Sequence, residues 1–371
     1  MNKIDPNIFS KIKTLASNDN VECIVYAHNY RIAKKYISNL VDNNSIIDFP
    51  FISAFAVTTD CQNICSIAGL ECVKYVSSVA YVSTCIDKSN DFLGTENLVV
   101  NNKNNISVAV IDTGCSPHID LMIPKKIIKF IDLVNDKKYM YDDNGHGTFV
   151  TGALCGSGAY SGGKFAGIDK DINVVSIKAL DKRGETGAVN ILKAMQWVYD
   201  NKSNYNIKVV CMSFGATPLN SGDPLIRGAE ILWDSGVVVV CAAGNSGPDS
   251  KTIKSPGASS KIITVGALDL ASGDVANFSS RGPGINSYKP DLLVPGVNVK
   301  GLNYKLNDYP YTLMSGTSVA APMVAGICSN IIKSSGKIST IRVKSILIQW
   351  CTQINGDKNA EGFGYYDKNK S

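Results

Sequence analysis

The sequence predicts an α/β protein built on a doubly wound, mostly parallel β-sheet, with a small α+β unit in front of it. Three observations lead to this fold class. The chain has 371 residues, of which 44% are hydrophobic and 19% charged, as in globular domains. From residue 106 onward, short β-branched apolar runs alternate with helical patterns. Continuous apolar runs indicate strands buried on both faces, and alternation with helices indicates a parallel sheet.

The N-terminal unit covers residues 21–85. Hydrophobic periodicity predicts its elements in this order: a strand at 21–27, a helix at 30–41, a strand at 51–58, a helix at 61–70 and strand character at 73–83. The polar stretch from Cys85 to Asn97 has the composition of a linker. We therefore predict two domains, residues 1–90 and residues 91–371.

The larger domain contains the repeated strand-and-helix theme. The predicted strands are 106–112, 172–180, 207–215, 236–245 and 261–268, and the predicted helices include 149–156, 186–201 and 223–236. In open parallel sheets, ligands bind beyond the carboxyl ends of the strands. Polar residues that end these runs are therefore the candidate site residues.

Four residues at such places carry chemistry. Asp112 ends the first run, His146 lies between two glycines just before a helix, and Asn245 ends "VVVVCAAGN". Ser318 lies at a loop-to-helix junction in "MSGTSVAAPMVAG". Taken singly, each has an ordinary explanation: a turn aspartate, a core histidine, a turn asparagine or a helix cap. Together they have the residue types that nucleophilic acyl transfer requires.

The roles follow from elementary chemistry. The hydroxyl of Ser318 is too weakly acidic to attack an amide unaided, so His146 must take its proton and Asp112 must orient the imidazole. The side-chain amide of Asn245 and the backbone N–H of Ser318 would then stabilise the oxyanion.

The residues around Ser318 suggest why this segment is rich in small side chains. We expect Gly316 and Thr317 to leave the approach to Ser318 open. We also expect Pro322 to begin the helix whose dipole faces the developing charge.

The blocks "VIDTG", "NGHGTFVTG", "AAGNSG" and "SGTSVAAPMVAG" resemble, in this order, the signature blocks of the subtilisin-like serine proteases, the subtilases. Further matches are "NFSSRGP" and "KPDLLVPGVNV", and the resemblance covers residues 106–350. It implies a serine endopeptidase with no required cofactor, acting on peptide or protein substrates.

The N-terminal unit resembles the propeptide of this family, a chaperone and inhibitor whose tail occupies the active-site cleft. This resemblance implies a zymogen that cleaves itself between Cys85 and Asn97 and binds its own N-terminal domain in cis. The other interpretation of this unit is a small docked domain without that role.

The resemblance also implies how substrate binds. An extended peptide would pair with the backbone of one segment, and a second segment would form the opposite wall of the pocket for P1, the residue before the cleaved bond. These two walls are Ser213, Phe214 and Gly215, and Ala242, Ala243 and Gly244. Their small residues leave room for a sizeable P1 side chain. Lys254 falls near the position that closes the pocket, and we hypothesise that it favours an acidic or polar P1 residue; the alternative is an ordinary exposed lysine.

Composition and charge indicate which binding partners and which cellular compartment to expect. The net charge of +5 is mild and the basic residues are scattered, so we expect neither a nucleic-acid nor a membrane partner. Eleven cysteines without a CxxC pair, and no apolar signal segment, predict a cytoplasmic protein without disulfides. In these features the chain resembles the cytoplasmic alkaline-protease-type subtilases of Gram-positive bacteria.

A metal is not required by this chemistry, and we predict none in the site. Acidic pairs such as Asp142 and Asp143 could ligate structural calcium, but solvated turn carboxylates are the favoured interpretation.

Two other functions stay open at this point. A catalytically silent subtilase-fold protein could act as a regulatory or binding partner. A cysteine hydrolase using Cys115, close to Asp112, is less favoured because no cysteine stands between small residues at a helix start.

Overall fold

The computed structural model describes residues 3–14, 19–85, 106–219, 222–305 and 309–371. The predicted boundary between residues 90 and 91, and the predicted linker beyond Cys85, lie outside the described residues.

An antiparallel sheet of four strands, in the order β2-β3-β1-β4, forms the centre of the N-terminal unit. Its strands are β1 (Asn20–Ala27), β2 (Ile46–Phe49), β3 (Ala54–Asp60) and β4 (Val73–Ser78), and its helices are α1 (Pro6–Thr14), α2 (Tyr30–Ile37) and α3 (Cys61–Gly69). The predictions at 21–27, 30–41, 51–58 and 61–70 are thus confirmed as to type, whereas α1 and β2 were not predicted. The predicted run at 73–83 is divided between β4 and a separate strand, β5 (Tyr81–Thr84).

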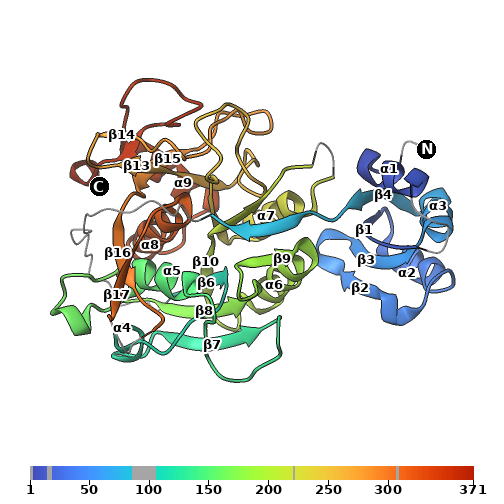
Figure 1. The fold of residues 1–371 in the computed structure, drawn as a ribbon, viewed down its shortest axis with the longest axis horizontal. Coiled ribbons are helices and arrows are strands. Elements are labelled where there is room, and N and C mark those ends of the chain that lie inside the picture. The colour runs from blue at the N-terminus through green and yellow to red at the C-terminus, as the bar shows by residue number, and fades with distance from the viewer. Residues whose placement is uncertain (1–2, 15–18, 86–105, 220–221, 306–308) are drawn as a thin grey trace.

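Both faces of this small sheet are buried, each in a different core. On β1, Cys23 and Val25 belong to the core beneath the three helices. Ile24 and Tyr26 point the other way and belong to the core of the larger unit. Because side chains alternate between the faces of a strand, the sheet is packed between its own helices and the rest of the molecule. Figure 1 shows this unit in blue at one end of the molecule.

The larger unit is built on a ten-stranded sheet in the order β18-β19-β15-β13-β12-β10-β6-β8-β7, with β14 paired to β13. The pairs are parallel except for β13 with β14 and β18 with β19. The strands are β6 (Ser107–Asp112), β7 (Ile127–Asp132), β8 (Asn173–Lys178), β10 (Ile207–Met212), β12 (Val238–Ala242), β13 (Ile263–Asp269), β14 (Asp274–Val275), β15 (Leu292–Pro295), β18 (Cys351–Thr352) and β19 (Tyr365–Tyr366).

The five predicted strands are confirmed, and they lie side by side as β13, β12, β10, β6 and β8. Every residue of β6 and β12 is buried, as expected for strands covered on both faces. The run at 207–215 breaks at Ser213 into β10 and a short strand, β11 (Phe214–Ala216). The edge strand β7 was not predicted, because its apolar run is broken by Lys129 and both Ile128 and Lys129 are exposed.

Helices pack on this sheet in two groups. The helix α5 (His146–Cys155) contacts α8 (Thr317–Ser335), and both contact strands of the sheet. The helix α6 (Ala188–Asn201) contacts α7 (Pro224–Asp234) and, like α7, packs against the sheet. The remaining elements are α4 (Ile119–Met122), α9 (Thr340–Gln349) and a two-stranded ribbon of β16 (Val299–Leu302) with β17 (Tyr311–Met314). The observed architecture is the predicted α/β class.

A third small sheet joins the two units. In it, β5 lies between β11 and β9 (Glu185–Gly187), antiparallel to both. This strand therefore belongs to the N-terminal unit in sequence and to the larger unit in pairing.

Two global features complete the description. The eleven cysteines, all within the described ranges, are free thiols. No helix among the described residues has both the length and the apolar character needed to cross a bilayer.

Candidate active site

The structure brings Asp112 and His146 together as the sequence predicted. Asp112 is the last residue of β6, and His146 is the first residue of α5. The Oδ1 atom of Asp112 lies 2.7 Å from Nδ1 of His146, and both side chains are only 1% exposed. A carboxylate acceptor at Nδ1 assigns the proton to that nitrogen and leaves Nε2 free to accept another.

The glycines beside His146 are explained by a close backbone approach. The N–H of Gly147 donates to Oγ1 of Thr113, at 2.9 Å. A methyl group added to Gly147 would lie 2.1 Å from the carbonyl oxygen of Gly114. Glycine is therefore required for the start of α5 to lie directly against the turn after Asp112.

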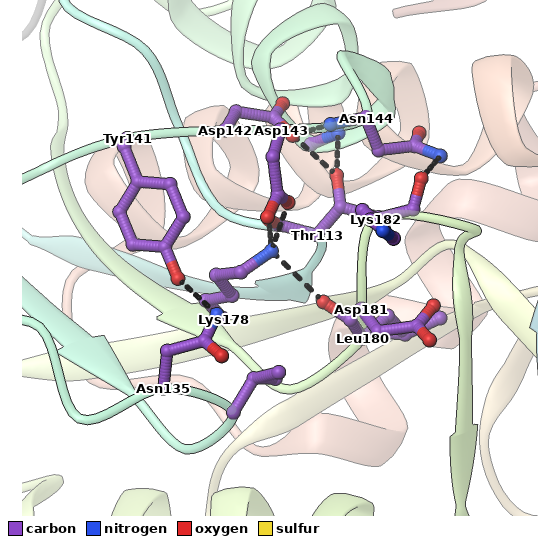
Figure 2. A network of polar contacts seen from close by, with 12 residues as sticks. Thr113, Asn135, Tyr141, Asp142, Asp143, Asn144, Lys178, Leu180, Asp181 and Lys182 are labelled. Carbon is purple, nitrogen blue, oxygen red and sulfur yellow. Dashed lines mark hydrogen bonds and ion pairs between the residues drawn. The ribbon is translucent and has the colours of Figure 1, made fainter.

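A buried polar network fixes these two segments relative to each other (Figure 2). Asp142 accepts hydrogen bonds from the hydroxyls of Thr113 and Thr148 and from the N–H of Gly145. The ammonium of the fully buried Lys178 donates to the carbonyl oxygen of Thr113, at 2.6 Å, and pairs with Asp143, at 2.6 Å. The network ties the loop that carries His146 to the turn that follows Asp112.

The carboxylates of Asp142 and Asp143 thus bind donors of the protein itself. Within the described ranges, no group of three or more side chains is arranged to hold a metal ion. Calcium at this pair therefore stays the less favoured of the two interpretations.

The second half of the site is the N-terminus of α8. Asn245 follows β12, and its Oδ1 atom accepts hydrogen bonds from the backbone N–H of Thr317, at 3.0 Å, and from its hydroxyl, at 2.9 Å. The oxygen end of the amide is therefore occupied, and its Nδ2 end is free to face a ligand. Ser318, the second residue of the helix, is fully buried.

One expectation about this segment was wrong, and another needs an addition. Thr317 was expected to leave the approach to Ser318 open; its hydroxyl also accepts from the N–H of Gly244, at 3.0 Å, and so orients Asn245 against α8. Pro322 does not begin the helix but lies inside it, because α8 starts at Thr317. Proline has no N–H, so the carbonyl oxygen of Ser318 lacks the usual partner four residues on.

Gly316, in contrast, is required by the geometry. Its φ of +151° is one that L side chains rarely adopt. A methyl group there would lie 2.3 Å from the carbonyl oxygen of Cys85, 3.0 Å from Nδ2 of Asn245 and 3.1 Å from Oγ of Ser318. These three atoms therefore surround one small space.

Four buried polar atoms in this region have no hydrogen-bond partner within the described part of the chain. They are Oδ2 of Asp112, Nε2 of His146, Nδ2 of Asn245 and Oγ of Ser318. In particular, the structure does not form a hydrogen bond between Ser318 and His146. Buried polar groups are nearly always paired, so this cluster of four neighbouring unpaired atoms is a candidate functional site. Hydrogen bonds of this kind are often loose before the reacting complex forms.

The chain's own residues 81–85 occupy the cleft beside these atoms. The N–H of Thr84 donates to the carbonyl oxygen of Gly184, at 2.9 Å, and the N–H of Cys85 donates to that of Ser213, at 3.4 Å. The carbonyl oxygen of Cys85 accepts from the N–H of Ser318, at 3.3 Å. Residues 81–85 thus form an extended segment that is hydrogen-bonded along both edges. The carbonyl group of its last residue, Cys85, lies at the backbone N–H of Ser318.

The first predicted wall pairs with this segment. Phe214 and Gly215 pair with Thr84 and Ser83 through β11, and Ser213 pairs with Cys85. The second predicted wall is hydrogen-bonded to Lys254. The N–H of Lys254 donates to the carbonyl oxygen of Ala243, at 2.9 Å. This wall consists of Ala242, Ala243 and Gly244, of which the alanines are fully buried or nearly so.

Sequence reasoning missed two parts of the site. Cys85 was assigned to the start of a linker, and the second edge of the cleft, β9, was not expected. The alternation in Tyr81, Val82 and Ser83 is a local signal for a strand, but nothing local indicates its distant partners.

The alternative nucleophile, Cys115, is fully buried, and burial raises the pKa of its thiol well above the ordinary value, as does nearby Asp142. A thiol held in its protonated form is a poor nucleophile.

The chain is similar to known proteins in both sequence and fold. The sequence model of the subtilase family matches residues 103–365. The chain is 43% identical over 268 residues to serine protease AprX of Bacillus subtilis (strain 168), covering 65% of this chain and 60% of AprX. It is 32% identical over 264 residues to subtilisin DY of Bacillus licheniformis, covering 70% of this chain and 88% of that protein.

Solved structures match as well. Sphericase superimposes with a TM-score of 0.65 at 27% identity, covering 75% of this chain and 95% of that one. Fervidolysin from Fervidobacterium pennivorans has a TM-score of 0.76 at 20% identity, covering 95% of this chain and 61% of that one, which is a likeness of fold alone. From the family match over most of its length, we conclude that the chain belongs to the subtilase family.

Proposed function

We propose that this protein is a serine endopeptidase in which Ser318, His146 and Asp112 act as nucleophile, general base and orienting carboxylate. The observation that carries the proposal is the carbonyl oxygen of Cys85, which accepts from the N–H of Ser318 beside the unpaired Nδ2 of Asn245. This is the arrangement needed at a carbonyl about to be attacked.

The proposed reaction begins when Oγ of Ser318 forms a bond to the substrate carbonyl carbon and its proton passes to Nε2 of His146. Asp112 stabilises the resulting imidazolium through Nδ1. The oxyanion is held by the N–H of Ser318 and Nδ2 of Asn245. The imidazolium then gives its proton to the leaving amine as the C–N bond breaks, and water hydrolyses the acyl-enzyme by the same steps.

We further propose that the first substrate is the chain itself, cleaved between Cys85 and Ile86. The segment at residues 81–85 has the antiparallel pairing of a bound peptide, which supports this bond over others between Cys85 and Asn97. The N-terminal unit would then act in cis as an inhibitor whose tail fills the cleft. On this proposal the unit ends at Cys85, five residues before the predicted limit.

The decisive experiment compares purified wild type with Ser318→Ala, using a fluorophosphonate probe and intact mass. We expect wild type to be labelled once and to release an N-terminal fragment ending at Cys85. Ser318→Ala should stay unlabelled and intact. Cleavage in the purified Ser318→Ala variant would contradict self-processing by Ser318.

A catalytically silent binding protein is the second candidate. It is supported only by the missing hydrogen bond between Ser318 and His146. A folded wild type that neither reacts with the probe nor cleaves casein would favour this candidate.

The cellular location is also a proposal. Eleven free thiols, several of them in the sheet, support a reducing compartment such as the cytoplasm. Fractionation of the native host with an antibody to the chain would test it.

A further inference from the structure

The pocket beside the reacting carbonyl is shaped by Lys254, and this inference rests on the function proposed above. The P1 side chain in the structure is that of Cys85, which is buried and lies over Gly215: its sulfur is 3.5 Å from the position of a β-carbon on that glycine. On the proposed function, the small side chain of Cys85 therefore marks where a P1 side chain lies.

The backbone holds Lys254 between the two walls of this pocket. Its N–H donates to the carbonyl oxygen of Ala243 in one wall. The next residue, Ser255, exchanges two hydrogen bonds with Ala216, which continues the other wall. Ala243, Ser255 and Ala216 are all buried, so the position of the Lys254 backbone is set by the fold.

The stem of Lys254 occupies the space that the wall glycines leave. A β-carbon on Gly215 would lie 2.5 Å from Cβ of Lys254, and one on Gly244 would lie 2.4 Å from Cγ of Lys254. The glycines therefore make room for the lysine stem and not for a large substrate side chain. This packing argues against the expectation that the small wall residues leave room for a sizeable P1 side chain.

The ammonium of Lys254 has no ion-pair or hydrogen-bond partner within the described part of the chain. Its charge reaches the P1 position: burial raises the pKa of the Cys85 thiol to about 12, and Lys254 acts against that rise. A short anionic side chain at P1 would feel the same field.

We propose that Lys254 is a specificity-determining residue that restricts P1 to short side chains such as Cys, Ala and Ser, and favours Asp over its neutral isostere Asn. The stem sets the size limit and the ammonium sets the charge preference. Cys85 satisfies the size limit, which is consistent with its place as the chain's own P1 residue.

The test uses quenched peptides with the sequence of residues 81–88, in which the position of Cys85 is Cys, Ala, Asp, Asn, Leu or Phe. Rates are expressed per Ser318 labelled by fluorophosphonate, so that incomplete release of the N-terminal unit does not distort them. For wild type we expect kcat/KM to be at least about tenfold higher for Ala than for Phe, and higher for Asp than for Asn, because pocket fit discriminates by about 10- to 200-fold.

Two variants separate the stem from the charge. Lys254→Gly should raise the Phe rate by about tenfold or more relative to Ala. Lys254→Met keeps a stem of similar length, so it should keep the preference for Ala over Phe and lose the preference for Asp over Asn. The matched control is Lys251→Gly, the same change at an exposed position outside the pocket and with φ of +62°, which should leave all ratios unchanged.

A second arm tests the same idea within the full chain. Cys85→Phe should slow release of the N-terminal fragment about tenfold or more, and the double variant Cys85→Phe with Lys254→Gly should recover it.

The outcomes separate the two proposals. A protein that is not labelled and cleaves no peptide overturns the proposed function. A labelled, active protein that prefers Phe or Leu at P1, or whose preferences do not move in Lys254→Gly, overturns only the role of Lys254.

Discussion

Helix α8 carries two fully buried serines, and the protein surrounds them in opposite ways. At the start of the helix, Oγ of Ser318 has no partner within the described residues. Eleven residues later, Oγ of Ser329 donates to Asp169, at 2.6 Å, and Asp169 also pairs with the buried Lys333, at 2.6 Å. The polar groups around Ser329 are thus hydrogen-bonded or ion-paired, whereas Oγ of Ser318 is not hydrogen-bonded to any described residue.

On the proposed function, the difference separates polar groups that stabilise the fold from polar groups that take part in the reaction. A buried, unpaired polar group costs free energy, whereas a paired one does not incur that cost. Substitutions in the Ser318 cluster should therefore change activity with little loss of stability. Substitutions in the Asp169 cluster should do the reverse.

The largest effect is expected at Ser318. Ser318→Ala should lower kcat by about 10⁴-fold or more, because the nucleophile is lost. Its free energy of unfolding should stay within about 1 kcal/mol of wild type or rise, since no hydrogen bond is removed. The matched control Ser329→Ala should lose about 1.5 to 3 kcal/mol of stability, because its hydrogen bond is to a charged group. Urea unfolding measures both, and equal losses in the two variants would refute the contrast.

The next largest effect is expected at Lys333. Lys333→Met should destabilise the protein by about 3 to 5 kcal/mol, because it leaves the carboxylate of Asp169 buried without its cation. The activity per fluorophosphonate-labelled molecule should stay near that of wild type. A drop in kcat without a drop in stability would show that this cluster also serves the site.

Asn245 sharpens the comparison, because one end of its amide is hydrogen-bonded within the described part of the protein and the other end is not. Oδ1 binds Thr317, and Nδ2 is unpaired. Asn245→Ala should lower kcat by about a hundredfold or more, since one oxyanion donor is typically worth ~3 to 4 kcal/mol. It should also cost about 1 kcal/mol of stability through the lost contact with Thr317. Unchanged kcat would remove Asn245 from the proposed mechanism.

The smallest effect concerns a third buried pair, Lys289 with Asp291, at 2.6 Å. Burial lowers the pKa of Lys289 from 10.5 to about 8, although Asp291 opposes this. In the window between about 8 and 10.5, the unfolded chain binds this proton more strongly than the folded one, so stability should rise with pH there. The contribution of Lys289 to the free energy of unfolding is fully present above pH 10.5. It is lost as the pH falls through about 8.

Other groups titrate in the same window, so the measurement is a difference between variants. The urea unfolding free energy of wild type minus that of Lys289→Met should increase from pH 7.5 to pH 10. A difference that is flat or falls with pH would mean that Lys289 stays charged in the folded protein throughout.

Much of the fold could be predicted because its signals are local. The five continuous apolar runs are strands in the middle of the sheet, and their buried composition is independent of what they pair with. The elements that were missed are those with weak or mixed patterns, such as the edge strand β7 and the short strand β2.

The candidate site likewise has a part that could be predicted from the sequence and a part that could not. The types of residue at strand and helix ends, Asp112, His146, Asn245 and Ser318, could be chosen from the chain alone. A strand end or a helix start is a local event, and the topology of a parallel sheet brings such ends to one edge.

Three features were decided only by the folded molecule: which end of the Asn245 amide faces the cleft, which residues of the N-terminal unit lie in that cleft, and which side chain packs against Gly215. Each depends on contacts between residues far apart in the chain, such as Thr317 with Asn245, β5 with β9 and β11, and Lys254 with Gly215. Periodicity and short motifs carry no information about such distances. The packing of the whole chain sets them.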